Sequence, residues 1–158
     1  MTVSCSGLGW NGLQIDISYG HVVTPEPSSV HFTNLLPEFP APLIRAYPIY
    51  TVLAEKLHAI VDGGMRNSRM KDFYDVWFLR STPSLDVNQL RTAVQQTFAR
   101  RQTPMPAKES VVAFSDQFAS EKQADWNRFL ARNQLRDPEG SLRAVTARIQ
   151  DFSKPLFS

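Results

Sequence analysis

The amino-acid sequence predicts an α+β fold, in which a strand-rich segment precedes a mainly helical lobe. Two observations support this prediction. Residues 13–19 alternate between apolar and polar side chains, which is the period of a half-buried β-strand. After Pro48, apolar residues instead recur every three or four positions, which is typical of amphipathic helices. Strands and helices are therefore expected in separate parts of the chain.

Composition narrows the class of protein before any motif is considered. Hydrophobic residues make up 42% and charged residues 20% of 158 residues, which is ordinary for a globular domain. A net charge of +2 is too small to argue for nucleic-acid binding. Cys5 is the single cysteine, which excludes a disulfide scaffold and a cysteine-rich zinc site. No apolar run is long enough for a membrane helix, so a soluble, cytoplasmic protein without a membrane segment is predicted.

The first predicted strand covers residues 13–19 and places Asp16 on its polar face. Pro25 and Pro27 interrupt the chain after it, because proline cannot donate to a strand ladder. Two more short strands are expected at residues 30–35 and 43–47, and the sequence does not indicate how they pair.

Five helices are expected after Pro48. The first covers residues 49–62 and ends at Gly63-Gly64, and the second is capped by Asn67 or Ser68. The aromatic residues of the second helix are expected to form a core with the first. The remaining three helices are predicted from Asp86 to about Arg100, at residues 121–133 and at residues 141–152, with a proline-containing linker at residues 103–107. We divide the chain into a partial sheet (1–48), a helical segment with the polar site (49–102) and C-terminal helices (103–158).

The polar residues that are candidates for chemistry gather in the first two predicted helices. Lys56 lies at the border of the first apolar stripe, so its ammonium group is able to reach a cleft. Asp72 and Asp75 share one face of the second helix, and the intervening loop carries Arg66 and Arg69. Carboxylates and cations in one hairpin suit a site that holds a polyphosphate and polarises a hydroxyl group.

Structural alternatives remain open for the same residues. Lys71 and Asp75 are four positions apart and are able to form a surface ion pair. Asp72 near a helix N-terminus favours the helix dipole without any catalytic role. His58 beside an apolar stripe is more typical of a structural histidine. Arg101, with Arg100 and Arg91, indicates either a modest basic patch for RNA phosphates or a solvated helix end.

Three segments carry a resemblance to a known family: LQIDISYGHVVTPEP, FPAPLIRAYPIYTVLAEKLHAIV and NSRMKDFYDVWFL. They resemble the AbiEii/AbiGii-type nucleotidyltransferase toxins, and the similarity covers nearly the whole chain. The resemblance implies a nucleotidyltransferase fold, transfer of nucleotides from an NTP to RNA such as the 3′ end of tRNA, Mg²⁺ as cofactor, and control by a cognate antitoxin.

Residue by residue, the resemblance implies that Lys56 contacts the triphosphate. Arg66 and Arg69 are further nucleotide-binding candidates because of their place in the loop of the same hairpin. It implies that Asp72 and Asp75 position the attacking group or orient the lysine. Asp16 resembles a later strand carboxylate that contributes to metal binding or acts as a general base, although an exposed strand residue without function explains it as well.

The family's glycine-rich turn and paired aspartates have no counterpart in this sequence. Those groups cradle phosphates and bind Mg²⁺, so we expect a truncated toxin that is inactive alone. The alternative is a non-catalytic binding module that docks RNA, an antitoxin or a complementary chain. An incomplete sheet would also expose an unpaired edge, which predicts self-association.

Overall fold

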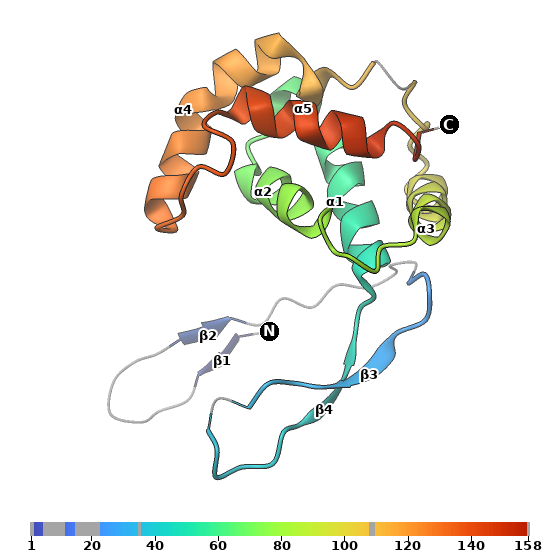
Figure 1. Ribbon diagram of the computed structural model, residues 1–158, viewed down its shortest axis with the longest axis vertical. Coiled ribbons are helices and arrows are strands. Elements are labelled where there is room, and N and C mark those ends of the chain that lie inside the picture. Colours follow the sequence, from blue (N-terminus) through green and yellow to red (C-terminus); the bar gives the residue numbers. More distant parts are fainter. Residues whose placement is uncertain (1, 5–11, 15–22, 35, 108–109, 158) are drawn as a thin grey trace.

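The computed structural model describes residues 2–4, 12–14, 23–34, 36–107 and 110–157. Within these ranges, two small antiparallel hairpins precede five α-helices, which confirms the α+β prediction. The helices pack into one body, and the β3–β4 hairpin extends away from it (Figure 1). The chain passes directly from that hairpin into the first helix, so the strands and the helical lobe are consecutive, as expected.

The strands form two separate two-stranded sheets. β1 (Thr2–Ser4) pairs antiparallel with β2 (Gly12–Gln14). β3 (Ser28–His31) pairs antiparallel with β4 (Leu43–Ala46). β4 lies where a strand was predicted at 43–47, whereas β3 begins two residues before the strand predicted at 30–35 and shares only residues 30–31 with it. β1 was not predicted. β2 confirms the start of the strand predicted at 13–19, and the rest of that strand, including Asp16, lies outside the described residues.

The first helix, α1, covers Ile49–Gly63 and ends where glycine was expected to end it. Gly64 has a φ of +48°, a conformation that L side chains rarely adopt, and a short 3-10 helix, η1 (Gly64–Arg66), follows. The next helix, α2, covers Met70–Leu79. The predicted cap by Asn67 or Ser68 is wrong, because Arg69 occupies the N-cap position without a side-chain cap bond.

The later helices follow their capping residues. α3 (Val87–Arg100) begins after Asp86, whose carboxylate accepts hydrogen bonds from two backbone N–H groups, and α5 (Leu142–Ser153) begins after Ser141 in a similar way. α4 (Asp116–Arg132) begins five residues earlier than predicted, because Ser115 accepts a hydrogen bond from the backbone of Phe118 after the short helix η2 (Val112–Phe114). The 103–107 stretch is not helical, as its prolines predicted.

One hydrophobic core holds the helical lobe together. α1 packs against α2 and α3, while α5 packs against α2 and α4. Core side chains come from both predicted helical segments, since the buried cluster extends from Leu53 to Phe157. Phe73 on α2 is fully buried and stacks on Phe118 of α4 with 5.3 Å between ring centroids. The α1–α2 hairpin therefore rests on a packed support, which fixes the side chains on its polar face.

Candidate functional site

The α1–α2 hairpin brings together the three residues that were predicted to be catalytic. The Lys56 Nζ atom on α1 lies 2.9 Å from Asp72 Oδ1 and 2.6 Å from Asp75 Oδ2, both on α2. The side chains of Lys56 and Asp72 are 19% and 10% exposed, so this is a largely desolvated cluster. The helical spacing predicted that Asp72 and Asp75 share one face of α2 within the same hairpin as Lys56, and the structure turns that face toward Lys56.

The surface ion pair that was the alternative for Asp75 is also present. The Lys71 Nζ atom lies 2.6 Å from Asp75 Oδ2, the same oxygen that Lys56 contacts. The Lys71 side chain is 71% exposed, in contrast to that of Lys56. Two lysines therefore share one carboxylate, one from the interior of the hairpin and one from its surface.

The proximity of these charges shifts two pKa values. Burial lowers the pKa of Lys56, but hydrogen bonds and charge attraction from Asp75 and Asp72 outweigh burial and leave this pKa above its ordinary value. Burial raises the pKa of Asp75, but hydrogen bonds and charge attraction from Lys56 and Lys71 outweigh it and leave the pKa below its ordinary value. Lys56 is thus an ammonium and Asp75 a carboxylate at neutral pH.

The second oxygen of Asp72 has a less complete set of contacts. Asp72 Oδ2 is buried, and the described residues place no N–H or O–H group in hydrogen-bonding geometry with it. The Arg69 Nε atom lies 3.3 Å away as an ion-pair partner, and the Arg69 side chain is 72% exposed. A buried carboxylate oxygen without a hydrogen bond is costly, and the charge of Arg69 offsets part of that cost.

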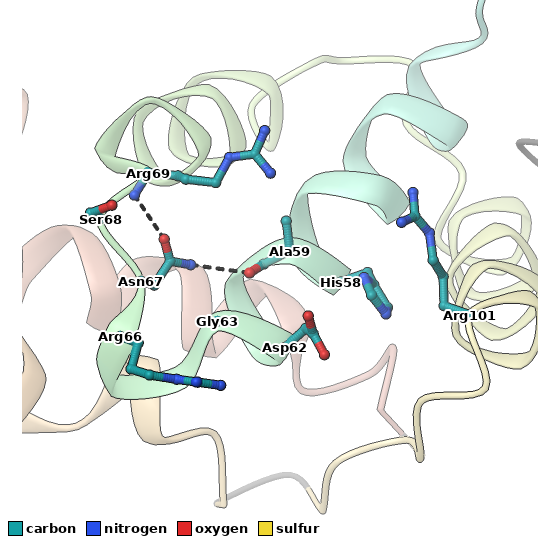
Figure 2. A pocket seen from close by; sticks show the side chains of 9 residues that line it. All are labelled: His58, Ala59, Asp62, Gly63, Arg66, Asn67, Ser68, Arg69 and Arg101. Atoms are coloured by element: carbon teal, nitrogen blue, oxygen red, sulfur yellow. Dashed lines mark hydrogen bonds between the residues drawn. The ribbon is translucent and has the colours of Figure 1, made fainter. Parts of the chain in front are cut away.

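An open pocket of about 420 Å³ lies at the loop between α1 and α2, and Lys56, Asp72 and Asp75 are not among the residues that line it. Figure 2 shows Arg69 on one side of α1 and Arg101 on the other, with Arg66 beyond the C-terminal end of α1 and with His58 and Asp62 between Arg66 and Arg101. Ala59, Gly63, Asn67 and Ser68 complete the lining. The structure therefore places both predicted nucleotide-binding arginines in one pocket, and Arg69 connects that pocket to Asp72.

Asn67 fixes the shape of the loop between α1 and α2. Its side-chain amide donates to the backbone oxygen of Ala59 at 3.1 Å and accepts from the backbone N–H of Arg69 at 2.8 Å (Figure 2). These two bonds attach the loop to α1 and set the start of α2. They also account for the failed cap prediction, because the Asn67 side chain bonds the N-cap residue rather than the first turn of the helix.

Two pocket residues were assigned other roles from the sequence. The Arg101 guanidinium forms an ion pair with Glu55 at 2.6 Å, across 46 positions of sequence. Arg91, which the sequence grouped with Arg101, instead donates to the backbone oxygen of Pro155 and does not line the pocket. His58 is buried, as a structural histidine would be, yet it also lines the pocket. A long-range pair such as Glu55–Arg101 leaves no local signal in the sequence.

The His58 ring is tied to the linker after α3. Its Nε2 atom lies 2.8 Å from the hydroxyl of Thr103, and its ring meets that of Phe98 edge-on with 5.0 Å between centroids. Burial lowers the pKa of His58, and the positive charge of Arg101 lowers it further against the opposing charges of Asp62 and Glu55. His58 is therefore neutral at neutral pH.

The described carboxylates do not form a metal site. No group of three His, Cys, Asp or Glu side chains in the described ranges is arranged to hold a metal ion. Asp72 and Asp75 face an ammonium group instead. Asp16, the predicted metal ligand, lies outside the ranges that the structure covers. In the same ranges, no helix is long and apolar enough to cross a membrane.

Comparison with known families identifies the class of this protein. A family model described as the nucleotidyl transferase AbiEii toxin of a type IV toxin–antitoxin system matches residues 7–152. This match covers most of the chain, so the protein belongs to the AbiEii family, whose members are nucleotidyl transferase toxins. No curated protein and no solved structure matched the chain.

Proposed function

We propose that this chain supplies the lysine, carboxylates and arginines of a nucleotidyltransferase site that transfers nucleotides from an NTP to RNA, with the 3′ end of tRNA as acceptor. The observation that carries this proposal is the Lys56–Asp72–Asp75 cluster, which the Arg69–Asp72 pair connects to a pocket lined by arginines. A desolvated ammonium between carboxylates, next to exposed guanidinium groups, provides the charges that a triphosphate and an attacking hydroxyl require.

In the proposed reaction, a 3′ hydroxyl oxygen of the RNA forms a bond to the α-phosphorus of the NTP. The bond from that phosphorus to the β-phosphate oxygen breaks, and pyrophosphate leaves. A carboxylate of the acidic pair, Asp72 or Asp75, receives the hydroxyl proton or orients Lys56. The Lys56 ammonium offsets the negative charge that accumulates on the transferring phosphate.

Arg69 is the proposed connection between binding and chemistry. In the absence of ligand it lies over Asp72 Oδ2 without making a hydrogen bond to it, and most of its side chain is exposed. A triphosphate in the pocket would attract Arg69, together with Arg66, because phosphate oxygens match the donors of a guanidinium group. That movement would uncover Asp72 Oδ2, and this oxygen would then accept a hydrogen bond from the attacking hydroxyl.

The proposal covers only the part of the site that these 158 residues provide. Mg²⁺ would supply charge neutralisation in the complete site, but the described carboxylates do not fit it, so its ligands must include groups such as Asp16 outside the described residues. The glycine turn and paired aspartates implied by the resemblance are absent from the sequence. We therefore propose that these residues do not transfer nucleotides without those groups, and that the protein acts in the cytoplasm.

Nucleotide titration followed by calorimetry tests this proposal. The purified chain is titrated with each NTP in the presence of Mg²⁺, and the measurement is repeated with Lys56→Ala and with Lys71→Ala. The two variants remove the same charge from the two lysines that contact Asp75, but Lys71 is exposed. Saturable binding that Lys56→Ala abolishes and Lys71→Ala preserves is the expected result.

Absence of NTP binding, in a wild-type chain whose helical circular dichroism shows that it is folded, would overturn the nucleotide function. It would favour the alternative, a non-catalytic module that docks RNA, an antitoxin or a complementary chain. A transfer assay with tRNA and labelled NTP accompanies the titration, and labelled RNA formed by this chain alone would contradict the proposed inactivity.

The β3–β4 hairpin supports a proposal about protein partners. Large apolar side chains on and around this hairpin are more than a third exposed, including those of Phe32, Leu36, Phe39, Leu43 and Tyr47. Exposed apolar groups in such a concentration are typical of surfaces that associate. We propose that this region mediates self-association or contacts the cognate antitoxin. Light scattering at micromolar concentration tests self-association, and a clean monomer would contradict it.

A further inference from the structure

We propose that Arg101 is a third phosphate-binding arginine of the pocket, held by Glu55 until a polyphosphate arrives, and that the pocket takes a chain of phosphates rather than a single one. This inference rests on the proposed function and deepens it, because it adds a residue that the sequence did not single out for the nucleotide. Arg101 lines the same pocket as Arg66 and Arg69, and lies on the opposite side of α1 from Arg69 (Figure 2).

The charges in the pocket favour an anionic ligand. Its lining contains three arginines and one carboxylate, Asp62, and two of the arginines pair with carboxylates outside the lining, Arg69 with Asp72 and Arg101 with Glu55. The Arg66 side chain has no ion-pair or hydrogen-bond partner in the part of the chain that the structure describes, and Arg69 holds Asp72 only by charge. Arginines that are not committed to strong carboxylate contacts remain available to bind phosphate oxygens.

The position of Arg101 allows it to exchange its ion pair with Glu55 for a contact with a phosphate. It directly follows α3, and its backbone N–H bonds to the oxygens of the last turn, so its Cα is held by a rigid element. Its side chain is 44% exposed and its partner Glu55 is 22% exposed, so their ion pair is partly solvated and weak enough to be exchanged for a phosphate. Glu55 and Lys56 are consecutive on α1 but face different partners, Arg101 for Glu55 and the aspartates of α2 for Lys56.

The size of the pocket and the spread of its cations indicate more than one phosphate. A volume of about 420 Å³ falls in the range of small-molecule sites. The three arginines reach the pocket from different directions: Arg69 and Arg101 lie on opposite sides of α1, and Arg66 lies beyond its C-terminal end (Figure 2). A single phosphate is too compact to contact both sides, whereas a chain of phosphates is able to span them.

Titration with inorganic tripolyphosphate, without Mg²⁺, tests the pocket independently of the nucleoside and of catalysis. Arg101→Ala should weaken binding by about tenfold, the effect of one lost charge-assisted contact. Glu55→Gln should tighten binding by up to about fivefold, because Arg101 is released. Arg132→Ala, which removes one exposed arginine from the end of α4, is the matched control and should leave binding unchanged.

The outcomes separate this inference from the proposed function. Unchanged tripolyphosphate binding in Arg101→Ala, or weaker binding in Glu55→Gln, would contradict the proposal that Glu55 holds Arg101 until a polyphosphate binds. The nucleotide function is tested separately, by the effect of Lys56→Ala on NTP binding. Orthophosphate that binds as tightly as tripolyphosphate would overturn the polyphosphate assignment. If the chain binds tripolyphosphate through Arg101 but does not bind NTP, the anion-pocket proposal stands and the proposed nucleotidyltransferase function is contradicted.

Discussion

The side chain of Asn67 occupies the space that a Cβ atom on Gly63 would need. Such an atom would lie 2.8 Å from the amide nitrogen of Asn67, closer than non-bonded atoms approach. Gly63 has an ordinary helical φ of −67°, so its glycine is required by this contact and not by the backbone conformation. The close approach brings the α1–α2 loop onto α1 and so defines the floor of the pocket.

Gly63→Ala should therefore lower the free energy of unfolding by about 1–2 kcal/mol. The overlap with Asn67 costs more than the gain of up to about 1 kcal/mol that alanine brings to a helix. Chemical denaturation of the wild type and the variant measures the difference. In the Asn67→Gly background, which also removes the Asn67 Cβ atom that would lie 2.9 Å away, the same Gly63→Ala change should be neutral or stabilising. A persistent loss there would show that the contact is not the cause.

Lys56→Ala should lower the free energy of unfolding by about 2 kcal/mol. Its removal leaves Asp72 buried without its short ion-pair contact, and we place the cost below that of a fully buried pair because Lys56 is partly exposed. Lys71→Ala should cost at most about 0.5 kcal/mol, as an exposed pair within one helix does. Urea denaturation measures both variants. Equal losses in the free energy of unfolding would show that the Lys56–Asp72 pair stabilises the fold no more than the exposed Lys71–Asp75 pair.

His58 should make stability depend on pH near neutrality. Its folded pKa is lowered from 6.5, so between the two values the unfolded chain binds more protons than the folded chain. The contribution of neutral His58 is therefore present above pH 6.5 and is lost as pH falls through the folded pKa. Denaturation midpoints across this window should rise with pH in the wild type and flatten in His58→Gln. His31→Gln on β3 is the control and should retain the slope.

Asp75 should contribute a second, more acidic dependence. Its folded pKa lies below its ordinary value of 3.8, so its stabilising contribution is complete above that value and is lost as pH falls through the folded pKa. Asp75→Asn should reduce the slope of stability against pH in this acidic range, measured by thermal unfolding. An unchanged slope would mean that other carboxylates dominate acid unfolding.

The sequence predicted those features that depend on local patterns. Period and capping residues were sufficient for α1, α3 and α5, and helical spacing placed Asp72 and Asp75 on one face of α2, in the same hairpin as Lys56. The early start of α4 was missed although Ser115 was a visible capping signal. The role of Asn67 depends on its hydrogen bond to Ala59, eight positions earlier in the preceding helix. Capping rules consider only the first residues of the helix that follows, so they do not predict this bond.

The pocket itself was beyond sequence analysis. Arg101 reaches it only because α3 packs against α1, and its pairing with Glu55 spans 46 positions. The pairing of the strands was equally unreadable, since the short β3 and β4 hold mainly exposed residues and lack the burial pattern that would specify a partner. Tertiary packing decided both features.

The enclosure of Lys56 between two carboxylates has a consequence for its chemical reactivity. Only the unprotonated amine attacks acylating reagents, and a raised pKa together with 19% exposure makes that form scarce and shielded. Lys56 should therefore acylate far more slowly than Lys71, whose side chain is 71% exposed. Mass spectrometry after a brief acylation would give the modification rate at each lysine. A rise in the rate at Lys56 would show that its contacts with Asp72 and Asp75 have been lost.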